Sequence, residues 1–355
     1  MNSTPKVLNP LSIILAVQKG SCGVMNHNTK ILFLYESIFF FPKVPVFIQR
    51  DIDILSKSFK VKQFFFKFYK IFNLIGEIRR SDVVFIWFAG YPAFIATVIT
   101  RIINKPVIIV LGGYDVAAEK EIKYGQMRFA FFRYIGKFIL KNARKVLAVS
   151  EYNKKECENY LGITTAEVVY NCVDTKYFKP SGKKEDIVIS VGLISKMTIK
   201  RKGLDIFVKV AEKFPNIQFY MIGSGEKKAI EYLKSIAPSN VMFTGFISEE
   251  ELLKFYQKAK VYCQLSYYES FGVSVVEAMA CNCIPVTSNK AALPEVIGDA
   301  GFCTKYGEID DIADAVEQAL TDNDMGLKAR KRVVEHYSLE KRKEQLYKII
   351  TETVP

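Results

Sequence analysis

The order of its apolar segments constrains what this chain can fold into more than any other feature. Ten short runs are apolar at consecutive positions, and segments with apolar residues at helical spacing separate them. Strands that are apolar on both faces and alternate with helices are typical of parallel sheets covered by helices on both sides. The expected strands are residues 31–35, 83–89, 107–111, 146–149, 167–170, 187–191, 218–222, 241–243, 261–265 and 284–287.

Chain length and a break in this pattern predict two domains. Ten strands are many for one sheet, and 355 residues correspond to about two domains at roughly 100–200 residues each. Residues 174–184 contain proline, glycine and four lysines, and they interrupt the pattern. We therefore expect an α/β protein with two doubly wound, Rossmann-like domains, residues 1–178 and 179–337. A C-terminal helix at about 338–355 is expected to pack back on the first domain.

The excess positive charge of the chain is confined to its first half. Residues 1–180 hold 26 Lys and Arg against 13 Asp and Glu, whereas residues 181–355 hold 24 of each. Such asymmetry indicates a polyanionic partner for the first half. No nucleic-acid-binding motif accompanies the charge, so an anionic membrane surface or an acidic substrate is favoured over nucleic acid.

One segment of the basic half has a pattern of its own. Residues 59–75 (FKVKQFFFKFYKIFNLI) predict a helix with one wide apolar face and a basic edge that includes Lys60, Lys67 and Lys70. Two interpretations are open. This helix either belongs to the core of the first domain and has a solvated edge, or it docks on an anionic membrane.

The cysteines and histidines predict neither a disulfide framework nor a metal site. The seven cysteines are irregularly spaced without a CxxC pair, and the chain has only two histidines. The longest apolar stretch, residues 83–100, is interrupted by Gly90, Tyr91 and Pro92, so no transmembrane helix is expected. The apolar run at residues 11–17 follows a proline and little positive charge, which disfavours a signal peptide. We expect a cytoplasmic protein that is peripheral on the inner face of the membrane.

The chemistry is concentrated in residues 267–301. Glu269 precedes a turn, Ser270-Phe271-Gly272, and Glu277 lies in the helical segment that follows. A helix N-terminus after a glycine turn offers free N–H groups and a positive dipole end to a phosphate. A carboxylate can accept two hydroxyl hydrogen bonds, which suits a sugar or ribose diol. The alternative interpretation is that Glu269 caps the helix and Glu277 is a solvated surface residue.

This segment resembles the Glu-x7-Glu signature of family 4 glycosyltransferases, whose fold is called GT-B. Other motifs occur in that family's usual order, and the resemblance covers most of residues 30–350. The matching elements are Val149-Ser150, Asn171-Cys172-Val173-Asp174, Val191-Gly192, Lys202-Gly203-Leu204-Asp205, Gly223-Ser224-Gly225, Gly245-Phe246-Ile247, Glu269-Ser270-Phe271-Gly272, Glu277-Ala278-Met279-Ala280, Pro285-Val286 and Pro294-Glu295-Val296-Ile297.

The resemblance implies a role for each matching residue. Glu277 would bind the ribose hydroxyls of a nucleotide-sugar, and Glu269 would meet the donor sugar. Lys202 would pair with the diphosphate, although a solvated lysine in a basic turn is the plainer interpretation. The donor side would also include Ser270, Phe271, Gly272, Arg201, Gly192, Gly223 and Ile247. The acceptor side would include Gly112, Gly113, Tyr114 and Asp115. No metal or cofactor is implied beyond the donor itself.

The chain departs from the family's pattern at several positions. Leu193 replaces an arginine that many members carry after the Val-Gly pair, so one phosphate cation is missing or is replaced by Lys196, Lys200 or Arg201. Arg201 is the expected substitute because the loop 195–202 is long. Gly112 stands where many members have a histidine, and Cys172 replaces a glycine. Residues 36–45 contain no glycine where many members have a Gly-Gly loop. Asp115 could accept a proton or orient the acceptor hydroxyl, or it could simply cap a turn.

The function expected from the resemblance is a retaining, metal-independent glycosyltransferase of hexosyltransferase type. It would move a sugar from a nucleoside-diphosphate donor to a glycan or lipid-linked acceptor, as in polysaccharide, lipopolysaccharide or glycolipid biosynthesis. Two alternatives stay open. One is a nucleotide-sugar 2-epimerase on the same fold, and the other is a degenerate, non-catalytic member that only binds a nucleotide.

Overall fold

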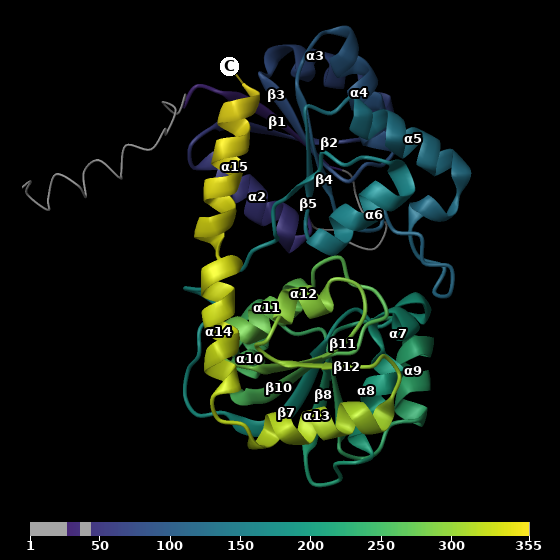
Figure 1. Ribbon diagram of the computed structural model, residues 1–355, viewed down its shortest axis with the longest axis vertical. Coiled ribbons are helices and arrows are strands. Elements are labelled where there is room, and N and C mark those ends of the chain that lie inside the picture. The colour runs from purple at the N-terminus through teal and green to yellow at the C-terminus, as the bar shows by residue number, and fades with distance from the viewer. Residues whose placement is uncertain (1–26, 36–43, 355) are drawn as a thin grey trace, which may run out of the picture.

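A computed structural model describes residues 27–35 and 44–354 of the chain, and Figure 1 shows its two sheets one above the other. Each sheet has six strands, and every strand pairing is parallel. The predicted α/β fold of two doubly wound parallel sheets is therefore confirmed. No helix within the described ranges is both long and apolar enough to cross a membrane. The apolar run at residues 11–17 lies outside those ranges.

The first sheet has the order β2-β1-β3-β4-β5-β6. Its strands are β1 (Lys30–Tyr35), β2 (Lys60–Phe65), β3 (Val83–Trp87), β4 (Val107–Leu111), β5 (Lys145–Ala148) and β6 (Glu167–Val168). The helical elements between them are α2 (Val46–Ser56), η1 (Phe68–Lys70), α3 (Ile71–Arg80), α4 (Tyr91–Ile102), η2 (Gln126–Arg128), α5 (Ala130–Lys141) and α6 (Glu151–Leu161). Apolar side chains of α3, α4, α5 and α6 cover one face of the sheet, and those of α2 cover the other.

The second sheet has the order β12-β11-β10-β7-β8-β9. Its strands are β7 (Glu185–Val191), β8 (Gln218–Ile222), β9 (Val241–Gly245), β10 (Ala259–Gln264), β11 (Ile284–Ser288) and β12 (Phe302–Thr304). Its helices are α7 (Lys196–Lys202), α8 (Leu204–Ala211), α9 (Lys227–Ser235), α10 (Glu249–Lys258), α11 (Val273–Ala280), α12 (Leu293–Ile297), α13 (Ile309–Thr321) and α14 (Met325–His336). All ten expected strands recur with small shifts at their ends, whereas β2 and β12 were not expected.

The last helix, α15 (Leu339–Thr353), returns to the first sheet and packs against α2. Figure 1 shows α14 and α15 as a column along one side of both sheets. Arg342 of α15 is fully buried and forms a bidentate ion pair with Asp51 of α2, with 2.7 Å between Nη2 and Oδ2. The indole of Trp87 donates to the same carboxylate, at 3.0 Å. A buried charge is tolerated only with such partners, so this contact fixes α15 to the first sheet.

The prediction of a helix over residues 59–75 is wrong. Residues 60–65 form the edge strand β2, which pairs with β1, and α3 begins only at Ile71. The first positions of the segment also satisfy a period of two, because Phe59 is buried and Val61 is half-buried, whereas the lysines Lys60 and Lys62 are exposed. Pairing with β1 satisfies the backbone groups of the strand, and edge lysines are a common protection of such strands. A membrane-docking helix at this place is therefore excluded.

Candidate active site

The residues singled out in the sequence gather where the carboxyl ends of both sheets face each other. The segment between β10 and α11 carries Glu269 and Ser270, and α7 ends at Lys202. The loop after β4 brings Gly112 and Asp115 from the first sheet. Ligands of open α/β sheets bind at the carboxyl ends of the strands, so this position suits a substrate site.

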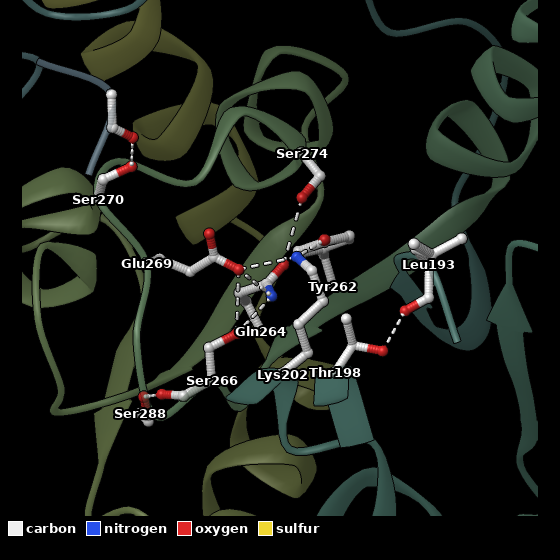
Figure 2. Close-up of polar contacts among 11 residues, drawn as sticks. Leu193, Thr198, Lys202, Tyr262, Gln264, Ser266, Glu269, Ser270, Ser274 and Ser288 are labelled. Carbon is white, nitrogen blue, oxygen red and sulfur yellow. Dashed lines mark hydrogen bonds and ion pairs between the residues drawn. The ribbon is translucent and has the colours of Figure 1, made fainter. Parts of the chain in front are cut away.

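Glu269 is largely buried and is paired with a cation. Its Oε1 lies 2.8 Å from Nζ of Lys202, and the Ser266 hydroxyl and the Gln264 amide donate to the same oxygen at 3.2 and 3.3 Å. Figure 2 shows these three donors converging on the carboxylate. Burial raises the pKa of Glu269, but Lys202 and Arg201 outweigh it and place the pKa below its usual value. Glu269 is therefore charged at neutral pH, and Lys202 is not a solvated lysine.

The Gln264 side chain is held in place by its own neighbours. The hydroxyls of Tyr262 and Ser274 donate to its Oε1 at 2.7 and 3.2 Å, which turns its amide nitrogen toward Ser266 and Glu269. These contacts are visible in Figure 2. Such supporting hydrogen bonds orient a site residue before a ligand arrives. Tyr262 and Gln264 lie in the strand expected at residues 261–265, and Ser274 lies in the segment 267–301, but the sequence analysis gave none of them a role in the site.

Glu277 is buried in α11 and meets a residue of α2, a helix that covers the first sheet. Its Oε1 lies 2.7 Å from Nη2 of Arg50, which belongs to α2, and its Oε2 is 3.5 Å from the Tyr256 hydroxyl. Arg50 also donates to the carbonyl of Cys172 at 2.7 Å. Burial raises the pKa of Glu277, and Arg50 offsets only part of this rise. Glu277 is thus not a solvated surface residue, and sequence reasoning missed Arg50 because no motif contains it.

The start of α11 has the geometry expected for binding an anion. Gly272 is the N-cap residue, with φ at +96°, and no side chain caps the helix. Glu269 therefore does not cap α11. The Phe271 side chain is buried against the rings of Tyr170 and Tyr337, at centroid distances of 6.2 and 5.2 Å. Only its backbone can therefore meet a ligand, and the free N–H groups of the first turn suit a phosphate.

Ser270 connects the two halves of the molecule through its side-chain hydroxyl and its backbone carbonyl. Its hydroxyl donates to the carbonyl of Gly112 at 2.9 Å, and its carbonyl accepts from the Ser150 hydroxyl at 2.7 Å. A Cβ added at Gly113 would lie 2.5 Å from Cβ of Ser270. The donor and acceptor segments identified in the sequence are therefore in direct contact.

Asp115 is buried, and backbone groups take up its carboxylate. Its Oδ1 accepts from the amides of Gly112 and Gly113 at 3.0 and 2.8 Å, and its Oδ2 accepts from that of Ala89 at 2.9 Å. Burial raises the pKa of Asp115 although these bonds oppose the rise. This geometry favours the turn-capping interpretation over a direct contact with an acceptor. Tyr114, by contrast, is exposed and packs on the ring of Tyr124 at 5.1 Å.

The missing histidine at position 112 has a structural explanation. A Cβ at Gly112 would lie 1.8 Å from a ring carbon of Phe88, so no side chain fits there. Phe88 itself has a φ of +71°, which is uncommon for a residue with a side chain. The Phe88 ring fills the space into which a histidine at this position would extend.

The segment expected as a long loop, residues 195–202, is the helix α7. Ser195 caps it in a capping box with Thr198, whose hydroxyl also donates to the carbonyl of Leu193 at 2.6 Å. Arg201 lies near the end of this helix, and its guanidinium stacks on Tyr124 at 5.1 Å from the ring centroid. Since Arg201 also acts electrostatically on Glu269, it remains close to the proposed donor side.

Two glycines allow the turns of the donor side to approach each other. A Cβ at Gly192 would lie 2.9 Å from Cδ of Lys202, and one at Gly223 would lie 2.1 Å from the carbonyl oxygen of Gly192. Gly223 also has a φ of +141°. Ile247 is half-buried and packs against the hydrophobic core, so its side chain supports this side. Residues 36–43, where the family's Gly-Gly loop was sought, lie outside the described residues.

Further contacts between the sheets were not predicted. The carboxylate of Glu295 accepts from the amides of Glu151 and Tyr152 at 2.8 and 3.1 Å, at the start of α6. The Tyr268 hydroxyl donates to the buried carboxylate of Glu156 at 2.6 Å. Ser150 caps α6, and Ser150 and Glu295 both belong to motifs named in the sequence analysis, but those motifs did not indicate that the two segments meet.

Comparison with known protein families settles the identity of the fold and its class. Residues 36–177 match the profile of Glycosyltransferase Family 4, and residues 174–336 match that of the group 1 glycosyl transferases. The chain belongs to glycosyltransferase family 4. Both halves of this glycosyltransferase are covered, so the predicted resemblance is confirmed.

Curated relatives match this glycosyltransferase at low sequence identity. It is 26% identical over 194 residues to a phosphatidylinositol N-acetylglucosaminyltransferase component of Arabidopsis thaliana, covering 52% of this chain and 43% of that protein. It is 24% identical over 273 residues to an uncharacterised glycosyltransferase of Methanocaldococcus jannaschii, covering 76% and 74%. The chain thus spans less than half of the plant relative.

Solved structures share the GT-B arrangement. The Anabaena protein HepE in complex with UDP matches with a TM-score of 0.76 at 16% identity, over 91% of this chain and all of that one. Sucrose-phosphate synthase from Thermosynechococcus elongatus matches with a TM-score of 0.72 at 16% identity, over 92% and 99%. At such low identity these matches establish the fold alone.

Proposed function

We propose that this glycosyltransferase transfers a sugar from a nucleoside-diphosphate-sugar to a glycan or lipid-linked acceptor, with retention of configuration and without a metal. One observation carries the proposal. Two buried carboxylates, Glu269 and Glu277, flank the uncapped start of α11, and each is paired with a cation.

The leaving diphosphate requires positive charge that is already in position. Its negative charge grows as the glycosidic bond breaks, and preorganised donors stabilise such charge without reorganisation. Lys202 holds Glu269 with one of its three ammonium protons, which leaves two for the phosphate oxygens. The amides of Phe271 and Gly272, at the start of α11, supply the remaining donors.

The two carboxylates orient the rest of the donor. Glu269 is charged and accepts from a hydroxyl of the transferred sugar, and its Oε2 has no hydrogen bond among the described residues. Glu277 accepts from the ribose hydroxyls. No side chain is assigned as a covalent nucleophile, and Asp115 keeps the acceptor loop in shape rather than moving a proton.

The names of relatives support the class of acceptor. The Arabidopsis relative is named for phosphatidylinositol, and a relative from Streptococcus pneumoniae is an alpha-galactosylglucosyldiacylglycerol synthase, 30% identical over 128 residues. Other relatives from Escherichia coli are O-antigen and serotype-specific mannosyltransferases. We propose a lipid-linked acceptor, as in glycolipid or surface polysaccharide assembly, with the protein at the inner face of the membrane.

Calorimetry with UDP, GDP, ADP and CDP tests the donor site directly. One of them should bind, and Glu277→Ala should weaken that binding by about tenfold or more, because hydrogen bonds to a charged group are lost. Glu317→Ala, an exposed glutamate of α13, is the matched control. Failure of all four nucleotides to bind would contradict the proposal.

A transfer assay separates the proposal from its alternatives. Each radiolabelled nucleotide-sugar is incubated with and without a lipid extract, and the products are separated by chromatography. Label in the lipid fraction supports the transferase. An epimer that forms without any acceptor would identify the epimerase instead, and nucleotide binding without turnover would identify a non-catalytic member.

A further inference from the structure

The beginning of α5 exposes a group of aromatic side chains that the core does not use. Phe131 is 67% exposed and Tyr134 is 77% exposed, and Phe129, just before the helix, is 52% exposed. The core-facing residues of α5 are instead Gly136, Ile139 and Leu140, in its second half. Scattered exposed apolar residues are normal in proteins, but three large rings within six residues form a patch that indicates an interaction surface.

Basic residues extend this patch along the helix. Arg133, Lys137 and Lys141 follow one another at a spacing of four, so they form one stripe on the helix surface. The Arg128 guanidinium lies 5.0 Å from the centroid of the Phe129 ring. No acidic residue occurs from residue 122 to residue 150, so no carboxylate of this segment neutralises the stripe.

The neighbouring helices continue this character at the same edge of the sheet. α4 packs against both α3 and α5. Tyr91 at the start of α4 is exposed, and so are Tyr69 in η1 and Phe72 at the start of α3. Helices that follow parallel strands begin at the carboxyl edge of the sheet, where the candidate active site lies. Figure 1 shows these helices on the side of the first sheet opposite to α15.

We propose that this surface, defined by Phe129, Phe131, Tyr134, Lys137 and Lys141, docks the enzyme on an anionic lipid bilayer. Aromatic rings favour the boundary between water and acyl chains, and lysines beside them are attracted to anionic headgroups. The aromatic rings lie in and just before the first turns of α5, at the carboxyl edge of the first sheet, so docking brings the candidate active site close to the plane of the membrane. This proposal assigns a role to part of the positive charge of the first half. The charge that binds the membrane lies on α5, and not on the helix that was wrongly expected at residues 59–75.

The charge pattern selects a bilayer over a second copy of the chain. A symmetric contact would bring the stripes of two copies together, and the segment has no carboxylate to compensate this repulsion. The inference rests on the proposed function only in that a lipid-linked acceptor explains why the enzyme would dock on a membrane. Binding to vesicles can be measured without donor, acceptor or turnover.

Flotation of the full chain with phosphatidylcholine vesicles, with or without phosphatidylglycerol, tests the surface. The wild type should float with the anionic vesicles at low salt and be released at high salt. Lys137→Gln with Lys141→Gln should lower the partition coefficient by roughly 30-fold, because each charge near the surface contributes about fivefold. Phe131→Ser with Tyr134→Ser should lower it at least tenfold at every salt concentration.

Matched controls lie on the second sheet. Tyr232→Ser with Leu327→Ser removes exposed apolar side chains from α9 and α14, and Lys228→Gln with Lys331→Gln removes two exposed charges. These variants should float like the wild type. Circular dichroism and nucleotide calorimetry verify that every variant is folded. Failure of the wild type to bind, or equal losses in the α5 and control variants, would overturn the proposal. The proposal would also be overturned if light scattering showed that the wild type is a dimer and that Phe131→Ser with Tyr134→Ser converts it to a monomer.

Discussion

The two carboxylates of the candidate donor site differ in where their partners come from. Glu269 pairs with Lys202 within the second domain, and both residues belong to recognisable motifs. Glu277 pairs with Arg50, which lies 227 positions away in the first domain and belongs to no motif. One half of the site is therefore complete within a single domain, whereas the other half exists only when both domains are in place.

A similar contrast holds for surface charge. The second domain has balanced charge and binds its diphosphate through Lys202 and backbone amides in our proposal. The first domain carries the positive excess and the exposed rings of α5. The donor therefore does not require the excess charge, which is available for another partner.

The largest expected effect concerns the contact that ties α15 to the first domain. Arg342→Met leaves the carboxylate of Asp51 buried with the Trp87 indole as its only side-chain donor among the described residues. We expect the free energy of unfolding in urea to fall by about 3–5 kcal/mol, because an unpaired buried charge is costly. Lys341→Met, on the exposed side of the same helix, is the control. Equal midpoints for both variants would show that the domains do not depend on this pair.

Lys202→Met tests whether the second domain alone supplies the leaving-group charge. We expect kcat for sugar transfer to fall by about 10²–10³, the range found when one preorganised donor is removed. Lys200→Met, two residues earlier in α7 and exposed, should retain nearly full activity. If the two variants lose activity equally, the general positive potential of α7 matters rather than the contact with Glu269.

Arg50→Met tests whether the first domain completes the ribose site. Burial raises the pKa of Glu277 and Arg50 opposes the rise, so removing Arg50 raises this pKa further. The carboxylate then takes up a proton at a higher pH and accepts fewer hydroxyl hydrogen bonds. We expect nucleoside-diphosphate affinity in calorimetry to fall about tenfold and to weaken further on acidification.

A control variant and a conservative variant accompany Arg50→Met. Asp53→Asn changes an exposed residue of the same helix and should leave affinity unchanged, and Arg50→Lys should recover part of it. Tighter binding by Arg50→Met would mean that Arg50 competes with the nucleoside for Glu277, and the assignment of Arg50 as a supporting residue would be wrong.

The smallest effect is expected at Glu156, which meets Tyr268 across the domain boundary. Burial raises the pKa of Glu156 from 4.5 to about 8, although the hydrogen bond from Tyr268 opposes the rise. Its contribution to stability is present below the unfolded value of 4.5 and is lost as the pH rises through about 8.

Glu156→Gln mimics the protonated side chain. It should change the free energy of unfolding by less than about 0.5 kcal/mol in mild acid and should stabilise the protein in alkaline solution. Urea titrations across pH measure this difference, with Glu158→Gln on the exposed side of α6 as control. An unchanged pH dependence would show that Glu156 does not titrate in this way.

Features that depend on neighbouring residues in the chain could be predicted from the sequence. The strand pattern and the turn before α11 follow from neighbouring positions in the chain, and ten strands were placed correctly. The prediction for residues 59–75 was wrong because their apolar spacing fits a helix, whereas the alternation of apolar and polar residues at 59–62 fits a strand. Pairing with β1, 30 positions earlier in register, decided between them.

Other features depend on space that the sequence does not describe. Position 112 was seen to lack a histidine, but only the fold shows that the Phe88 ring occupies the volume of any side chain there. The α5 surface could have been suspected, because its aromatic residues fall off the apolar stripe of the helix and no acidic residue lies nearby. Only the folded structure shows that these side chains stay exposed after α5 has packed on the first sheet.

The sequence by itself determined the alternation of strands and helices and the composition of the donor motif, because hydrophobic periodicity and turn chemistry act over a few residues. Only the tertiary structure decided that Arg50 meets Glu277, that Arg342 meets Asp51, and which lysines and rings remain outside. Ion pairing and burial depend on distance in space, and the packing of the two folded halves brings together residues that are hundreds of positions apart in the chain.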